Sequence, residues 1–199
     1  MLKFLILFAV LVNIAACHKS DPKFCAAEAK RFYSCTGSYN NFTRGVFEAN
    51  KKLIESSSTV APLGSQLGPE FKKMLKCIGD LECKGERKQI KFQIDTITFY
   101  SDRVTDAQQC IEGNDINQSL RECVALHKTF PLPKGFSSTV VPCVQQVLEG
   151  TDCSTAEKEG LERGARAVAD LYDQLDLVFA DKDYMKNFDL KFDPRNYGL

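Results

Sequence analysis

The sequence lacks every motif that would mark a common enzyme class. It contains no GxSxG, no HExxH and no glycine loop of the Walker or dinucleotide-binding type, so the patterns of esterases, zinc proteases and nucleotide-binding enzymes are absent. Histidine occurs only at His18 and His127. A histidine-dependent hydrolase would have to use His127, but no serine or free cysteine stands in a recognisable nucleophile context. We interpret His127 as a helix-end residue and predict a protein that is not an enzyme and uses no cofactor.

Excess charge of either sign is also missing. Lys and Arg together number 26, which equals the 26 Asp and Glu. The net charge therefore gives no reason to expect nucleic acid or an anionic membrane surface as a partner. There is no CxxC pair either, and with two histidines to supply imidazole we expect no metal site.

Long apolar runs are confined to the N-terminus. Residues Met1 to Cys17 carry one lysine and then an unbroken apolar run from Phe4 to Val12. This pattern is typical of a secretory signal peptide and is too short for a membrane span. Cleavage after Ala16 and cleavage after Cys17 both satisfy the small-residue rule, and we favour loss of Cys17. The alternative is a bacterial lipoprotein box, in which Cys17 would be lipidated.

Two features favour a secreted, extracellular eukaryotic glycoprotein over the lipoprotein. Asn41 and Asn117 each begin an Asn-x-Ser/Thr glycosylation acceptor. In addition, removal of Cys17 leaves an even number of cysteines in a chain bound for an oxidising compartment. We predict that these residues form four disulfides: Cys25, Cys35, Cys77, Cys83, Cys110, Cys123, Cys143 and Cys153.

Sequence cannot assign the pairs, because eight cysteines allow roughly a hundred connectivities. Geometry excludes some of them. If Cys25 and Cys35 lie on one straight helix, a rise of about 1.5 Å per residue separates them by roughly 15 Å. A disulfide tolerates about 7 Å between Cα atoms, so each of these cysteines is expected to reach another helix.

Helical signals dominate the mature chain. We predict an all-α, disulfide-stapled domain of about six helices over residues 18–181, followed by a C-terminal tail, 182–199, that either wraps on the body or is flexible. The first helix follows Asp21 and ends at Gly37, and a second is expected from about Asn41. A serine-, glycine- and proline-containing loop is predicted over 56–68, and Pro69 is expected to open the next helix, which ends at Gly79 or at Lys84-Gly85.

The segment 86–110 is ambiguous. Ile90, Phe92 and Ile94 alternate as in a strand, whereas Ile90, Ile94, Ile97 and Val104 fit one helical face. Since the segment contains neither proline nor glycine and is long for a strand, we predict a helix.

Later helices are expected over about 115–127, where Asp115 and Gln118 resemble a capping box, and up to Gly150 after a loop over 130–135. The last helix is the clearest. Ser154 and Glu157 form a capping box, and an apolar stripe recurs with steps of four and three at Leu161, Ala165, Val168, Tyr172, Leu175 and Phe179. We interpret the acidic residues near its end as a solvated face and not as a calcium loop: Asp170, Asp173, Asp176, Asp181 and Asp183.

Phe92, Phe99 and Tyr100 form an aromatic group that is either core packing, our first interpretation, or the lining of a ligand cavity between helices.

The cysteine spacing resembles a known family. Cys77, Leu81 and Cys83, the run IDTITFYSDRVTDAQQC and the later Phe136, Cys143 and Cys153 are similar to the nematode-expanded, secreted, cysteine-rich domain of unknown function nineteen. Asp95, Ile97 and Phe99 match the Cys-Asp-x-Ile-x-Phe segment of that family, with Ile94 in place of its cysteine. The resemblance covers about Cys25 to Phe179 and implies an extracellular helical domain without established enzymatic activity. A weaker likeness is to secreted insect haemolymph glycoproteins.

Together these features predict an extracellular binding or interaction module that meets another protein or the matrix. The alternative is a carrier of a small apolar ligand in a cavity between helices.

Overall fold

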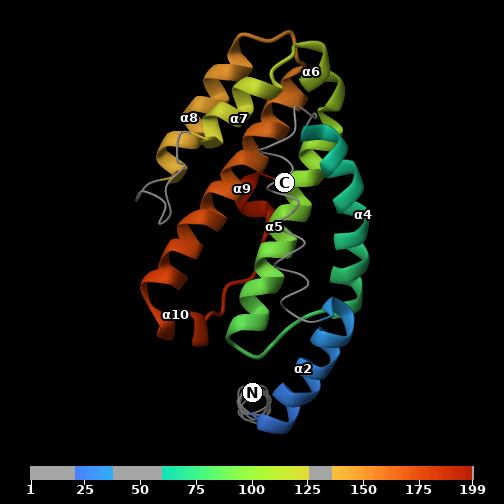
Figure 1. Ribbon diagram of the computed structural model, residues 1–199, viewed down its shortest axis with the longest axis vertical. Coiled ribbons are helices and arrows are strands. Elements are labelled where there is room, and N and C mark those ends of the chain that lie inside the picture. Colours follow the sequence, from blue (N-terminus) through green and yellow to red (C-terminus); the bar gives the residue numbers. More distant parts are fainter. Residues whose placement is uncertain (1–20, 38–59, 126–135, 199) are drawn as a thin grey trace, which may run out of the picture.

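The structure is a computed structural model that describes residues 21–37, 60–125 and 136–198 (Figure 1). These residues contain helices and no strand, which confirms the all-α class. The helices are α2 (Pro22–Thr36), α4 (Val60–Ile78), α5 (Glu86–Asp106), α6 (Gln108–Gly113), α7 (Asn117–Ala125), α8 (Phe136–Glu149), α9 (Thr155–Ala180), α10 (Lys182–Lys186) and the 3₁₀ turn η1 (Pro194–Tyr197).

Helix α5 is the centre of the molecule. It packs against α4 on one side and α9 on the other, while α8 covers the far side of α9 and α7 packs on α8. Figure 1 shows α2 at the lower end of the molecule, below α4, and α6 at the opposite end. None of the helices in the described ranges is long and apolar enough to cross a membrane.

Burial on several sides explains why the α5 sequence resembles both a strand and a helix. Ile90, Ile94 and Val104 are buried in the core, but so are the polar residues Thr96 and Thr98. The two threonine hydroxyls donate to the carbonyls of Phe92 and Ile94, four residues earlier, at 2.9 and 2.7 Å. Because polar groups are satisfied within the helix, α5 accepts burial on several faces, and a single apolar stripe is not required.

All eight predicted cysteines form disulfides, in four pairs with Cα atoms 5.1 to 5.8 Å apart. Cys25–Cys83 and Cys35–Cys77 attach α2 to the end of α4 and the loop that follows it. At the other end, Cys110–Cys153 ties α6 to the start of α9, and Cys123–Cys143 ties α7 to α8. Each cysteine of α2 therefore reaches a partner outside its own helix, as the geometric argument predicted.

The predicted loop over 56–68 is wrong for the part of it that the structure describes. Helix α4 begins at Val60 and continues through Pro69, which lies inside the helix and does not open it. Pro69 is on the exposed side, whereas Gly68 is buried against Ser101 of α5, to whose Oγ a Cβ would approach within 3.1 Å. The packing of α4 along α5 therefore outweighs the helix-breaking tendency of proline. The helix ends at Ile78, before Gly79 with a φ of 64°, which is the first of the two ends that the sequence left open.

The capping box proposed at Asp115 is also wrong. Helix α7 begins at Asn117, and Asp115 has a φ of 52°, in the left-handed region that an N-cap residue does not use. By contrast, the capping box of α9 is confirmed, because the Ser154 side chain accepts from the Glu157 N–H and the Glu157 carboxylate accepts from the Ser154 N–H.

Several predictions lie outside the described residues. These are the signal peptide, the helix expected from about Asn41, the glycosylation acceptor at Asn41, the loop over 130–135, and His18 and His127.

Candidate functional site

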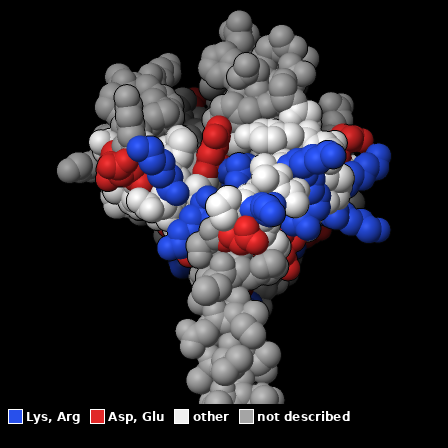
Figure 2. Space-filling model, turned by 90° about the horizontal axis from the view of Figure 1, so that it is seen from below, with Lys and Arg blue, Asp and Glu red and all other residues white. Residues whose placement is uncertain are grey.

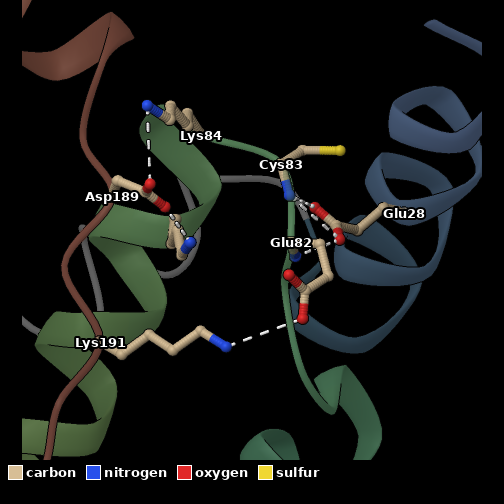
Figure 3. A network of polar contacts seen from close by, with 7 residues as sticks. Glu28, Glu82, Cys83, Lys84, Asp189 and Lys191 are labelled. Carbon is tan, nitrogen blue, oxygen red and sulfur yellow. Dashed lines mark hydrogen bonds and ion pairs between the residues drawn. The ribbon is translucent and has the colours of Figure 1, made fainter. Parts of the chain in front are cut away.

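The lower end of the molecule holds a network of polar contacts that joins three distant parts of the chain (Figure 3). Glu28 of α2 is buried, and its carboxylate accepts hydrogen bonds from the backbone N–H of Glu82 at 2.6 Å and of Cys83 at 3.1 Å. These hydrogen bonds satisfy two backbone N–H donors of the loop before α5. They hold α2 to that loop at the same place as the Cys25–Cys83 disulfide.

The C-terminal segment 187–197 closes the network from the other side. Its Phe188 carbonyl accepts from the Gly85 N–H at 2.9 Å, and Asp189 contacts the ammonium groups of Lys84 at 3.6 Å and of Lys88. The hydrogen bond from Lys88 holds the pKa of Asp189 below its usual value, with the charges of both lysines adding to the effect. The carboxylate is therefore ionised at neutral pH and ties the C-terminus to the start of α5.

Aromatic side chains hold the same segment along α5. Phe188 and Phe192 pack against Phe92 with ring centroids 5.7 and 6.2 Å apart, and Phe192 and Tyr197 pack against Phe99 at 5.4 and 5.8 Å. Of the two arrangements left open for the tail, the structure shows the wrapped one.

Two of the three residues predicted as possible cavity lining, Phe92 and Phe99, thus pack against the chain's own C-terminus. Phe92 also lines a hollow of about 270 Å³ that is bordered by α9, including Asp170, and by the C-terminal segment. The third, Tyr100, packs elsewhere, against Gly164 of α9, and its burial raises the pKa of its hydroxyl to about 12.

Cationic side chains gather on the outer surface of this end. Figure 2, which views the molecule from below, shows more Lys and Arg than Asp and Glu on this face, with carboxylates among the cations at several places. We define the basic end as the exposed cations of α2, the loop before α5, α10 and the C-terminal segment: Lys23, Lys30, Arg31, Lys84, Lys186 and Lys191.

Polar contacts join the segments that carry these cations. Arg31 donates to the Asp80 carbonyl at 2.6 Å, and Lys191 lies 3.7 Å from Glu82. The N-terminus of α5, with its partial positive charge, adds to the potential here.

The remaining candidate residues lie elsewhere. Asn117 is the first residue of α7, while the acidic residues 170–183 belong to the end of α9 and the start of α10. Among the described residues there is no group of three or more His, Cys, Asp or Glu side chains that could hold a metal ion.

Sequence reasoning missed the basic end. The contacts that bring its segments together join residues far apart in the sequence: Lys88 and Asp189 are 101 residues apart, and Glu28 is 54 residues from Glu82. A neutral net charge conceals such a cluster, because it reports a sum and not a position. Lysine and arginine exceed acidic residues over 84–91, but only Lys84 of that stretch belongs to the basic end, and Lys88 is buried.

No protein-family model, no curated protein and no solved structure matches this chain.

Proposed function

We propose that the protein is a secreted interaction module that meets an acidic extracellular protein or matrix component through its basic end. The observation that carries the proposal is the clustering of exposed Lys and Arg side chains on one face of a chain whose net charge is zero. A neutral protein gains no solubility from such segregation, whereas a complementary partner gains attraction and orientation from it.

The local acids leave these cations accessible to a partner. Lys84 lies 3.6 Å from Asp189, and Lys191 lies 3.7 Å from Glu82. The four side chains are at least 35% exposed, and ion pairs between such groups contribute little to stability. An incoming anion can therefore pair with Lys84 or Lys191 at small cost, while Asp189 keeps its hydrogen bond from Lys88.

The disulfides support an extracellular role. Two of them anchor α2, which carries half of the basic end, and disulfides persist in oxidising compartments. The alternative, a carrier of a small apolar ligand, has less support because the C-terminal segment packs on Phe92 and Phe99.

A matched pair of charge variants tests the proposal with heparin as the polyanionic probe. Lys84→Gln/Lys186→Gln removes two cations of the basic end, whose side chains are 61% and 75% exposed. Lys72→Gln/Lys73→Gln removes two cations of α4 with similar exposures of 57% and 77%. All four lysines have a carboxylate partner, so the two variants change net charge and lost pairing equally.

We expect the wild-type protein to be retained on heparin at physiological salt and the basic-end variant to bind about fivefold or more weakly. The α4 variant should elute with the wild type. If both variants bind heparin equally weakly, the binding depends on net charge and not on the basic end. If the wild-type protein is not retained on heparin, the proposal is wrong.

A further inference from the structure

The bend between α9 and α10 is made by one residue. Helix α9 ends at Ala180 and α10 begins at Lys182, and Asp181 between them has an extended backbone with a φ of −138° and a ψ of 110°. Residues 165–193 contain neither glycine nor proline, so no residue type near the bend forces the helix to stop. The chain turns back here, at the lower end of the molecule, and the C-terminal segment then runs upward beside α5 (Figure 1).

Asp181 holds the bend by capping both helices. Its N–H donates to the Leu177 carbonyl at 3.0 Å and completes α9, while its carboxylate accepts from the Asp183 N–H at 2.8 Å and begins α10. Next to it, the Tyr184 hydroxyl donates to the Gln174 side chain at 2.5 Å. In one straight helix these two residues would lie about 15 Å apart along the axis, so this hydrogen bond belongs to the bent form of the chain.

A straight form would have hydrogen bonds of its own. The last carbonyls of a helix and its first N–H groups have no partner within that helix. If the φ and ψ of Asp181 turned to helical values of about −63° and −42°, α9 and α10 would join into one helix, and these groups would pair with each other. The loss of one cap is thus offset by new backbone hydrogen bonds, and a change in one residue can move everything that follows it.

We define the arm as residues 182–197, which lie beyond the bend. Polar contacts hold the arm to the rest of the chain at some distance from Asp181. The Phe188 carbonyl accepts from the Gly85 N–H at 2.9 Å, and Asp189 forms ion pairs with Lys84 and Lys88. These partners of the arm lie at the start of α5 or in the loop before it.

Apolar contacts hold the arm as well. Phe188 is 3% exposed and packs in one cluster with Phe92 and Leu171, and the Tyr197 hydroxyl donates to Asp170 at 2.9 Å. A straight α9 would carry these rings into water and uncover Phe92, which is unfavourable unless another surface covers them. The body of a second copy offers the same partners in the same arrangement, because they all precede the bend. Exchange of an identical element is for this reason a low-cost route to a dimer.

We propose that Asp181 is a hinge and that two copies of the chain form a symmetric dimer by exchanging their arms. In the dimer, Asp189 of each arm pairs with Lys84 and Lys88 of the other copy. At low concentration the monomer is favoured, because the arm is tethered to its own body, and the dimer increases with protein concentration. This inference goes beyond the proposed function and does not depend on it.

Asp181→Ala tests the hinge, with light scattering of the disulfide-bonded protein over a range of concentrations. Alanine removes the cap and favours the straight helix. Since each dimer contains two hinges, we expect the variant to dimerise at a concentration about tenfold or more below that of the wild type. Asp21→Ala removes the cap of α2, whose carboxylate accepts from the Lys23 N–H at 2.9 Å, and this control should dimerise as the wild type does. If Asp181→Ala dimerises no more readily than the wild type, or if both stay monomeric up to millimolar concentration, the proposal is wrong.

Charge reversal distinguishes arm exchange from any other dimer. Lys88→Glu and Asp189→Lys each place like charges between the arm and its own body. When the two variants are mixed, each arm meets a body of opposite charge in the other chain, so we expect native mass spectrometry to show a heterodimer about tenfold or more abundant than either homodimer. The double variant Lys88→Glu/Asp189→Lys restores the attraction within one chain and should be as monomeric as the wild type.

Circular dichroism of each variant shows whether it has folded. If both single variants keep their helical content and their mixture forms no heterodimer, the arms are not exchanged. If Lys88→Glu does not fold, because residue 88 is buried, the comparison of Asp181→Ala with Asp21→Ala decides the question.

Discussion

At the scale of single residues, Glu28 shows how much one buried side chain can organise. The residue is 4% exposed, and its carboxylate joins α2 to a loop that lies more than 50 residues further along the chain. A buried carboxylate is tolerated because it accepts hydrogen bonds from the backbone N–H groups of Glu82 and Cys83. Glu28 therefore positions α2, and with it half of the basic end.

Replacing Glu28 with glutamine is expected to lower the free energy of unfolding by about 2 kcal/mol. The glutamine amide keeps one oxygen, which can still accept from the Glu82 N–H, but it turns its NH₂ group toward the Cys83 N–H, a donor that it cannot satisfy. Urea unfolding of the disulfide-bonded protein measures the change. Glu70→Gln, at a side chain that is 69% exposed, serves as the control and should stay within about 0.5 kcal/mol of the wild type. Equal effects of the two substitutions would show that Glu28 does not lock the loop.

At the scale of elements, two glycines set how closely α5 and α9 approach. Gly160 and Gly164 are four residues apart and lie on one face of α9, toward Arg103 of α5. A Cβ at Gly164 would stand 3.1 Å from Tyr100 and 3.3 Å from the Arg103 Cβ, which is tight, whereas a Cβ at Gly160 would stand 3.8 Å from its nearest neighbour. Glycine is thus required by packing at 164 but not at 160.

Gly160→Ala is therefore expected to stabilise the protein by about 0.5 to 1 kcal/mol, the usual gain of alanine over glycine within a helix. Gly164→Val is expected to destabilise it by about 1 to 3 kcal/mol, because the added atoms overpack the contact with Tyr100. Thermal unfolding of both variants measures the two effects. A stabilising Gly164→Val would mean that α5 and α9 are not in close contact at this point.

At the scale of the whole molecule, the four disulfides lie in two pairs, one pair at each end. Two bridges attach α2 to the lower end, and two hold α6, α7, α8 and the start of α9 together at the other end. Between them α5 runs the length of the body with core clusters along its sides. The bridges therefore restrain the peripheral helices, while apolar packing holds the centre.

Reduction is expected to destabilise the protein by several kcal/mol, because native disulfides in small secreted domains contribute about 2 to 5 kcal/mol each. The loops that they close span 20 to 58 residues, so the reduced chain regains much conformational freedom when it unfolds. Thermal unfolding with and without reductant measures the loss. An unchanged unfolding temperature after complete reduction, verified by mass, would contradict this account.

The sequence by itself determined the features that depend on neighbouring residues. The all-α class, the capping box of Ser154 and Glu157 and the use of eight cysteines all follow from local spacing or from cysteine count. A cap bonds to atoms three residues away, and a helical stripe repeats within two turns. Such signals are complete within a short stretch of sequence.

Only the tertiary structure decided which distant groups meet. Pro69 lies inside α4 because the helix packs along α5, the tail covers Phe92 and Phe99, and Lys84, Lys186 and Lys191 gather at one end of a neutral chain. The same is true of the disulfide pairs and of the hollow beside Asp170. These arrangements depend on contacts between segments tens of residues apart, whose energies are gained only once the chain has folded, and no local pattern records them.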